Sequence, residues 1–162
     1  MHPDLVVQML ALILIANGAP VVAKKLLGDR FAFPVDCGRR FLDGQPIFGK
    51  AKTVRGLVVS VFVTTCLAPA VGASFATGAL VAATAMAGDL LSSFAKRRLA
   101  LPPSSMCIGI DQIPESLLPG LACRWILPLL LADVALVVAL FFIGELALSR
   151  LLFVFKIRDQ PY

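Results

Sequence analysis

The chain has 162 residues and a formal net charge of +5; 59% of its residues are hydrophobic and only 15% are charged. Soluble domains carry roughly 25% charged and 45–50% apolar residues, so this composition excludes an ordinary soluble domain and favours a membrane protein. The length allows one domain, residues 1–162, which we expect to be a single all-α transmembrane domain with about five spans of ~20 residues.

The first apolar run, Leu5–Ala23, follows only MHPD and continues to Lys24 and Lys25. It has neither the positive n-region nor the small-residue cleavage site of a signal peptide, so it is predicted to be a retained span. Five spans are expected in all: Leu5–Leu26, Leu57–Val71, Ser74–Phe94, Pro114–Leu131 and Val134–Phe155. Prolines and an arginine interrupt the fourth of these, so four spans are the alternative.

Within the first span, the sequence Asn17-Gly18-Ala19-Pro20 interrupts the apolar pattern. Glycine and proline loosen a helix, and Asn17 brings an amide toward the bundle. A kink with a helix–helix hydrogen bond is the favoured interpretation, and contact of Asn17 with a substrate is the other.

The loop of residues 28–56 is a polar segment between apolar runs, with five glycines, three acids and six bases. Glycines let backbone N–H groups approach anionic oxygens. Lys50, Lys52 and Arg55, with Thr53, resemble a cluster that handles phosphate. A solvated basic loop on anionic lipid is the alternative interpretation.

The third span is rich in small residues, such as Gly78, Ala82 and Gly88, so it is predicted to be the central helix of the bundle. Near its end, Asp89 shares a helix face with Ser93 and Lys96. An acid on such a packed span is a functional hypothesis by default, and an interfacial anchor paired with a neighbouring base is the alternative.

The next loop supplies a second acid, Asp111, followed by Gln112. Two carboxylates from separate elements are expected to bind Mg²⁺, which prefers one or two protein carboxylates together with waters and phosphates. The four cysteines form no C-x-x-C pair and the only histidine is His2. Zinc is therefore not expected, and any mechanism with a buried catalytic histidine is excluded.

The basic residues test the span order. With five spans, all lysines and arginines except Arg124 share one side of the membrane. The positive-inside rule then predicts a multi-pass protein of the inner (cytoplasmic) membrane, with the N-terminus outside and the C-terminus in the cytoplasm. The polar residues converge on a cavity at that cytoplasmic side.

Five motifs taken together resemble the CDP-archaeol synthases, membrane cytidylyltransferases related to the CDP-diacylglycerol synthases. The motifs are ANGAP (16–20), P-x-D-x-G (34–38), D-G-x-x-I-F-G-x-x-K-T-x-R-G (43–56), G-D-L-x-x-S-F-x-K-R-R (88–98) and D-Q-x-P (111–114). The resemblance implies a bundle of five spans with a polar cytoplasmic cavity. It also implies an Mg²⁺-dependent reaction in which CTP and a lipid phosphate give a CDP-lipid and pyrophosphate.

On this basis Asp89 and Asp111 are the expected metal ligands, and Lys96 joins them as a catalytic residue. The expected substrate-binding residues are Asn17, Asp36, Asp43, Lys50, Lys52, Thr53, Arg55, Ser93, Arg97 and Gln112. The expected partners are CTP, a membrane lipid phosphate and the bilayer, and no nucleic acid. An isoprenoid ether lipid and an acyl ester lipid both remain open.

Rival functions fit the sequence less well. A CDP-alcohol phosphotransferase needs Ala-Arg at a fixed offset after Asp43-Gly44, and a phosphatidic acid phosphatase needs catalytic histidines; both are missing. A small transporter or a lipid-binding scaffold without catalysis is the non-enzymatic alternative. The sequence shows no internal repeat of the kind that transporters usually carry.

Overall fold

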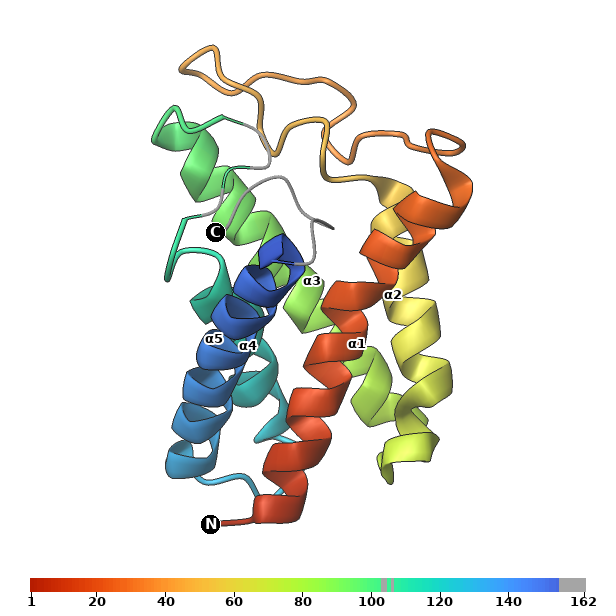
Figure 1. Cartoon of the computed structure of the whole chain (residues 1–162), viewed down its shortest axis with the longest axis vertical. Helices are drawn as coiled ribbons and strands as arrows, with labels where there is room; N and C mark the ends of the chain where they lie inside the picture. The colour runs from red at the N-terminus through yellow and green to blue at the C-terminus, as the bar shows by residue number, and fades with distance from the viewer. Residues whose placement is uncertain (103–104, 106, 155–162) are drawn as a thin grey trace.

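The computed structural model describes residues 1–102, 105 and 107–154. These residues form an all-α bundle (Figure 1). Its elements are α1 (Pro3–Leu27), α2 (Val54–Leu67), the short 3₁₀ helix η1 (Ala68–Val71), α3 (Phe75–Arg98), α4 (Gln112–Cys123) and α5 (Leu131–Val154). The expected helical bundle is therefore confirmed.

Helix α3 occupies the central position that its small residues predict, and it packs against α1, α2 and α4. A Cβ atom added at Gly78 would lie 2.6 Å from the Ala68 side chain and 3.0 Å from the Thr64 carbonyl oxygen. At Gly88 it would lie 2.3 Å from the Pro114 carbonyl oxygen on α4. Glycine at these two positions lets the neighbouring helices touch the α3 backbone.

Helix α1 continues through Pro20 without a break. Proline has no N–H, so the carbonyl oxygen of Ala16, four residues earlier, loses its usual helical partner. The buried hydroxyl of Ser60 on α2 donates to this oxygen at 2.7 Å. The Asn17-Gly18-Ala19-Pro20 segment therefore does yield a helix–helix hydrogen bond, but its donor is Ser60 and its acceptor is the Ala16 backbone.

Four helical segments in the described chain are long and apolar enough to cross a membrane: Pro3–Leu27, Val54–Val71, Phe75–Arg98 and Leu131–Leu148. Helix α4 was expected to continue to Leu131, but it ends at Cys123 after 12 residues. At 1.5 Å per residue it is about 18 Å long, shorter than the ~30 Å hydrocarbon core. It still carries the chain back toward the lower end of the bundle (Figure 1).

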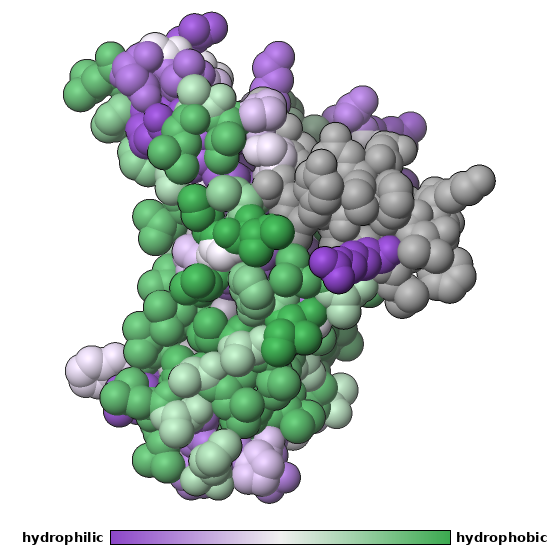
Figure 2. All heavy atoms as spheres, turned by 60° about the vertical axis from the view of Figure 1, so that its left-hand side comes forward, coloured by the Kyte–Doolittle hydropathy of each residue, from purple (hydrophilic) through white to green (hydrophobic). Residues whose placement is uncertain are grey.

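Hydrophobic side chains cover the body of the helices, and hydrophilic ones gather at the upper end (Figure 2). Inside, Met9, Leu12 and Ile13 of α1 pack with Val137 and Phe141 of α5 in the main core. Many large apolar side chains on the outside are exposed, as expected of helices that face lipid. The chain is a multi-pass membrane protein.

The two ends of the bundle differ in charge. The loop of residues 28–53 crosses the upper end, where the basic C-terminal turn of α3 also lies (Figure 1). At the lower end, the backbone N–H of His2 donates to the Asp133 carboxylate at 3.0 Å, and the His2 ring lies 3.0 Å from the other oxygen. This contact joins the start of α1 to the start of α5.

Candidate active site

A cavity of about 570 Å³ lies at the upper, basic end of the bundle, and all five α-helices contribute to its wall. Eight of the residues predicted from the sequence line it: Asn17, Lys50, Lys52, Thr53, Arg55, Asp89, Lys96 and Asp111. Elements far apart in the sequence thus bring the predicted acids and bases to one place.

Asp89 and Lys52, which both line the cavity, form an ion pair with 2.5 Å between Oδ1 and Nζ. The carboxyl group of Glu115 on α4 lies beside Asp89 as well. The close approach of α3 to α4 at Gly88 creates this contact, because it sets the Pro114–Glu115 backbone directly against α3. Two carboxyl groups in contact repel each other unless a proton or a cation lies between them, so Asp89 and Glu115 form a site that attracts positive charge.

Asp111 pairs with Lys96, with 2.6 Å between Oδ1 and Nζ, and Lys96 also donates to the carbonyl oxygen of Ser105 at 2.9 Å. The other oxygen of Asp111 accepts from the backbone N–H of Cys107 at 2.9 Å. The alternative for Asp89 was an anchor paired with a neighbouring base, yet the lysine that it contacts lies 37 residues away in the sequence. The lining of the cavity therefore contains two acid–lysine pairs.

Asp36 holds the basic loop in shape. Its carboxylate accepts three backbone N–H bonds, from Gly38 at 3.0 Å, Phe48 at 3.0 Å and Gly49 at 2.8 Å. Burial raises the pKa of this carboxyl, but the hydrogen bonds from Gly49, Phe48 and Gly38 outweigh burial, and the pKa falls below its ordinary value of 3.8. The backbone N–H groups of the glycine-rich loop thus bind the Asp36 carboxylate of the same loop. These hydrogen bonds fix the segment that carries Lys50 and Lys52.

Arg98 attaches the tip of the same loop to the end of α3. It pairs with Asp43 at 2.8 Å, donates to the Pro46 carbonyl oxygen at 2.7 Å, and its guanidinium lies 4.6 Å from the ring centre of Phe41 and 4.9 Å from that of Phe94. Such stacking suits the flat guanidinium group of arginine.

Two cavity residues have structural contacts at the start of α2. The hydroxyl of Thr53 caps this helix and accepts from the backbone N–H of Gly56 at 3.2 Å. Arg55 donates to the carbonyl oxygen of Gly28 at 2.8 Å and also to that of Arg30. These bonds close the loop over the upper ends of α1 and α2.

Five of the predicted residues lie outside the cavity lining: Asp36, Asp43, Ser93, Arg97 and Gln112. Arg97 is buried and donates to the Pro102 carbonyl oxygen at 2.9 Å, and Gln112 accepts from the backbone N–H of Gly109 at 2.7 Å. Ser93 is also buried. Substrate contact by these five residues stays a prediction.

The sequence analysis missed two acids, Glu115 and Glu145, that line the cavity. Glu145 had a usable signal, because it is the one acid within the long apolar run of the fifth span, and an ionisable residue in such a position is a functional candidate by default. Glu115 had a weaker signal, since it follows Asp111 by four residues and so returns to the same helix face.

The oxygen donors of the cavity suit a hard cation such as Mg²⁺. In the part of the chain that the structure describes, no three Asp, Glu, His or Cys side chains gather closely enough to hold a metal ion unaided. Mg²⁺ does not need such a cage, because it commonly binds one or two carboxylates together with waters and substrate phosphates. Asp89 and Asp111 both line the cavity, and metal binding by them stays a prediction.

Three comparisons with known proteins agree with one another. A family model described as CarS-like CDP-archaeol synthase matches residues 3–162. A CDP-archaeol synthase of Pyrobaculum calidifontis is 39% identical over 131 residues, which are 75% of this chain and 78% of that protein. One of Pyrococcus furiosus is 37% identical over 107 residues, and the alignment spans 60% of each protein.

A solved structure, described as an intramembrane enzyme for archaeal membrane lipids biosynthesis, has the same fold. It superposes with a TM-score of 0.73 at 25% identity, over 88% of this chain and 91% of the other. The motifs, the bundle and the family model all lead to the same assignment. The chain belongs to the CDP-archaeol synthase family of membrane enzymes.

Proposed function

We propose that this protein transfers CMP from CTP to the phosphate of a membrane lipid, giving a CDP-lipid and pyrophosphate in an Mg²⁺-dependent reaction. The observation that carries the proposal is the cavity itself. It combines the ion pairs Lys52–Asp89 and Lys96–Asp111 with further bases, Lys50 and Arg55, at the basic end of a membrane-spanning bundle. Such a cavity suits a polyanionic nucleotide on one side and an amphiphile on the other.

The nucleophile needs no general base. A phosphomonoester carries about −1.5 to −2 charges at pH 7, so its oxygen is already able to attack. This oxygen forms a bond to the α-phosphorus of CTP, the bond from that phosphorus to the bridging oxygen breaks, and pyrophosphate leaves with the electron pair. The chief obstacle is repulsion between two anions, which lysine and arginine side chains offset.

The two acid–lysine pairs suggest how the residues divide this work. Lys52 and Lys96 neutralise Asp89 and Asp111, and each lysine can turn from its carboxylate to a phosphate oxygen once a nucleotide enters. Mg²⁺ held by Asp89 and Asp111 would neutralise charge on the triphosphate. Glu115, which lies beside Asp89, adds a second carboxyl group at this place in the cavity lining.

The charge distribution supports an orientation with the cavity on the cytoplasmic side, where CTP is present. Residues 28–53 and the end of α3 carry most of the bases. By the positive-inside rule, the N-terminus then lies outside and α5 ends toward the cytoplasm. We propose that residues 1–162 act as one domain in this orientation.

The test supplies the purified protein, in lipid–detergent micelles, with labelled CTP, Mg²⁺ and either an isoprenoid ether or a diacyl lipid phosphate. Label should enter the organic phase with at least one of the lipids, and chelation should stop the transfer. Asp89→Asn should lower kcat by about a hundredfold or more. Asp4→Asn, at the exposed start of α1, is the matched control and should retain activity. If the folded wild-type protein transfers label to neither lipid, the proposal is refuted.

A further inference from the structure

An apolar groove of about 520 Å³ lies between α1 and α2, apart from the cavity. Its lining and that of the cavity share no described residue. Val22 of α1 lines the groove and is 57% exposed, so the groove opens on the surface that faces lipid. Gly18 helps to create the space, since a Cβ atom added there would meet no described atom within 4 Å.

The groove has the depth of one leaflet of a bilayer. On α1 its lining runs from Leu27 down to Ile15, so at 1.5 Å per residue it is about 18 Å deep. One leaflet of a ~30 Å hydrocarbon core is about 15 Å thick. The groove therefore suits a chain of a single lipid in the leaflet at the basic end of the bundle.

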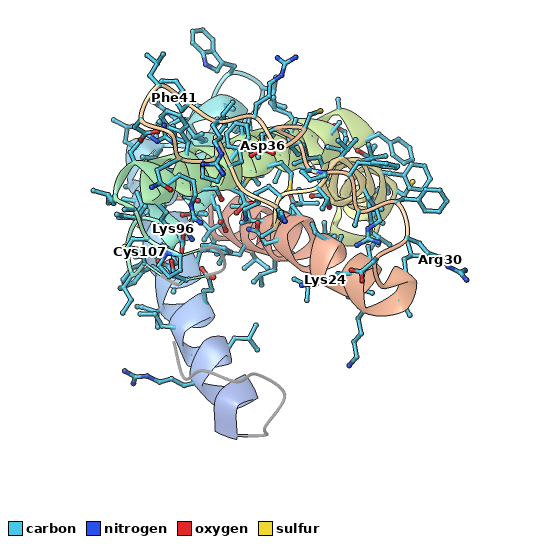
Figure 3. The ribbon with its side chains drawn as sticks, turned by 90° about the horizontal axis from the view of Figure 1, so that it is seen from above. Lys24, Arg30, Asp36, Phe41, Lys96 and Cys107 are labelled. Carbon is cyan, nitrogen blue, oxygen red and sulfur yellow. The ribbon has the colours of Figure 1, made fainter. Side chains whose placement is uncertain are left out.

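Two bases lie at the upper rim of the groove. Lys25 follows Val22 by three residues, so it lies on the same side of α1 one turn higher. The backbone N–H of Arg30 donates to the carbonyl oxygen of Leu27 at 3.1 Å, which places Arg30 one turn beyond the last groove residue of α1. Both side chains are exposed, and that of Arg30 points away from the bundle (Figure 3). The acid in this turn, Asp29, lines the cavity instead.

The carbonyl oxygens at the end of α1 would repel an anion, but hydrogen bonds cover them. Arg55 of α2 donates to the carbonyl oxygen of Gly28 at 2.8 Å and also to that of Arg30. The backbone N–H of Gly28 donates to the carbonyl oxygen of Lys24 at 2.9 Å. The rim therefore presents the positive charges of Lys25 and Arg30 without this opposing partial charge.

Exposed apolar side chains surround the same rim. Leu26 is 78% exposed, and Phe31 and Phe33 are each 69% exposed. The backbone of Phe31 has a φ of +57°, which is rare for a bulky residue. The carbonyl oxygen of Phe33 accepts from the backbone N–H of Val54, at the start of α2, at 2.9 Å. Both rings thus lie near the helix ends, where lipid chains meet their headgroups and can bury apolar surface.

We propose that the α1–α2 groove binds a resident anionic lipid, with one chain along Val22 and Val63 and its phosphate against Lys25 and Arg30. The lipid in this groove is not a substrate, so the site adds to the proposed function and does not depend on it. A second copy of the chain fits less well. Copies inserted the same way would bring their own Lys25 and Arg30 to the same level, where like charges repel.

The probe is phosphatidylglycerol, an anionic phosphodiester, and phosphatidylcholine with the same chains is the zwitterionic control. Neither carries the phosphomonoester that the proposed reaction consumes, so binding is measured without label transfer. Phosphatidylglycerol added to the purified protein in neutral detergent micelles should raise the melting temperature by several degrees, because a ligand of the folded state stabilises it. Phosphatidylcholine should give less than about half of that shift.

Variants assign the effect to the groove and its rim. Val22→Trp fills the groove and should abolish the shift from phosphatidylglycerol. Val7→Trp should keep it, because Val7 is 65% exposed and lines neither the groove nor the cavity. Lys25→Gln and Arg30→Gln should each raise the lipid concentration needed for the half-maximal shift by about fivefold. Arg39→Gln removes an exposed base from the basic loop instead and should match wild type.

Equal shifts with the two lipids would overturn the proposal, because the site would then not select charge. A shift from phosphatidylglycerol that persists in Val22→Trp would overturn it as well. If phosphatidylglycerol has no effect on the wild-type protein and Val22→Trp changes the oligomeric state measured by light scattering, the groove is an interface between copies and the proposal fails.

Cross-linking maps the site directly. Phosphatidylglycerol with a photoreactive group in one chain is incorporated into phosphatidylcholine vesicles with the wild-type protein, and adducts are mapped by mass spectrometry. Adducts at Val22, Val59 or Val63 support the proposal, whereas adducts only on other helices or in the cavity lining overturn it. The result holds even when the protein transfers no label, so failure of this site and failure of the proposed function are distinguishable.

Discussion

Replacement of Gly88 by alanine tests whether the close contact of α3 and α4 holds the active site together. The new Cβ atom would lie 2.3 Å from the carbonyl oxygen and 2.5 Å from the carbonyl carbon of Pro114, and 2.8 Å from the backbone nitrogen of Glu115. All three are backbone atoms, so no side chain can rotate away. Real Cβ contacts begin near 3.0–3.4 Å, so α4 must retreat from α3 by roughly 0.7–1.1 Å.

The shift acts directly on the chemistry, because Glu115 reaches Asp89 from the displaced segment. Overpacking of this kind costs about 1–3 kcal/mol of stability. A displacement of about 1 Å near reacting groups costs on the order of a hundredfold in rate. We therefore expect Gly88→Ala to fold with a lowered melting temperature and to lose about two orders of magnitude in kcat.

The assay is label transfer from CTP to lipid, with thermal unfolding measured in the same micelles. Gly144→Ala is the matched control, since its Cβ would meet no described atom within 4 Å, and it should keep wild-type rates. Wild-type kcat and melting temperature in Gly88→Ala would refute the reasoning, and so would an equal loss in Gly144→Ala.

Two further predictions concern the basic loop, and limited proteolysis of residues 28–53 measures both. The pKa of Asp36 is lowered, so its ionised form stabilises the folded loop above about pH 4, and this protection from cleavage is lost as the pH falls through the lowered pKa. Asp36→Asn should remove the protection at neutral pH, whereas the control Asp29→Asn should keep it. Arg98→Lys keeps the charge but loses the guanidinium stacking on Phe41, so cleavage of the loop should become several-fold faster. The side chain of Arg30 points away from the bundle (Figure 3), so the control Arg30→Lys should be cleaved at the wild-type rate. Equal cleavage of each variant and its control would contradict the corresponding role.

The sequence predicted the helices better than the ion pairs that join residues of different helices and loops. Hydropathy and small residues were enough to identify the four long segments and the central place of α3. The extent of α4 was harder to predict, because the apolar residues after Cys123 continue the hydropathy signal through the turn that ends the helix. Apolar composition alone does not reveal where a short helix stops inside a membrane protein.

Within the site, charge and spacing predicted that Asp89, Asp111 and several lysines would meet. The partners could not be predicted, because ion pairs such as Lys52–Asp89 join positions 37 residues apart and depend on how the loop folds back. The role of Asp36 in the loop was hidden for the same reason, since its donors at Phe48 and Gly49 follow it by 12 and 13 residues.

The contact between His2 and Asp133 bears on when the enzyme is assembled. It joins residues 131 positions apart, so the first helix reaches the ribosome exit long before its partner exists. At roughly 5–20 residues per second, α1 waits about 7–26 s for the start of α5. Because the cavity needs both Asn17 of α1 and Glu145 of α5, it is completed only after the last helix has been inserted. A nascent chain arrested before that helix carries the basic loop but not the finished cavity.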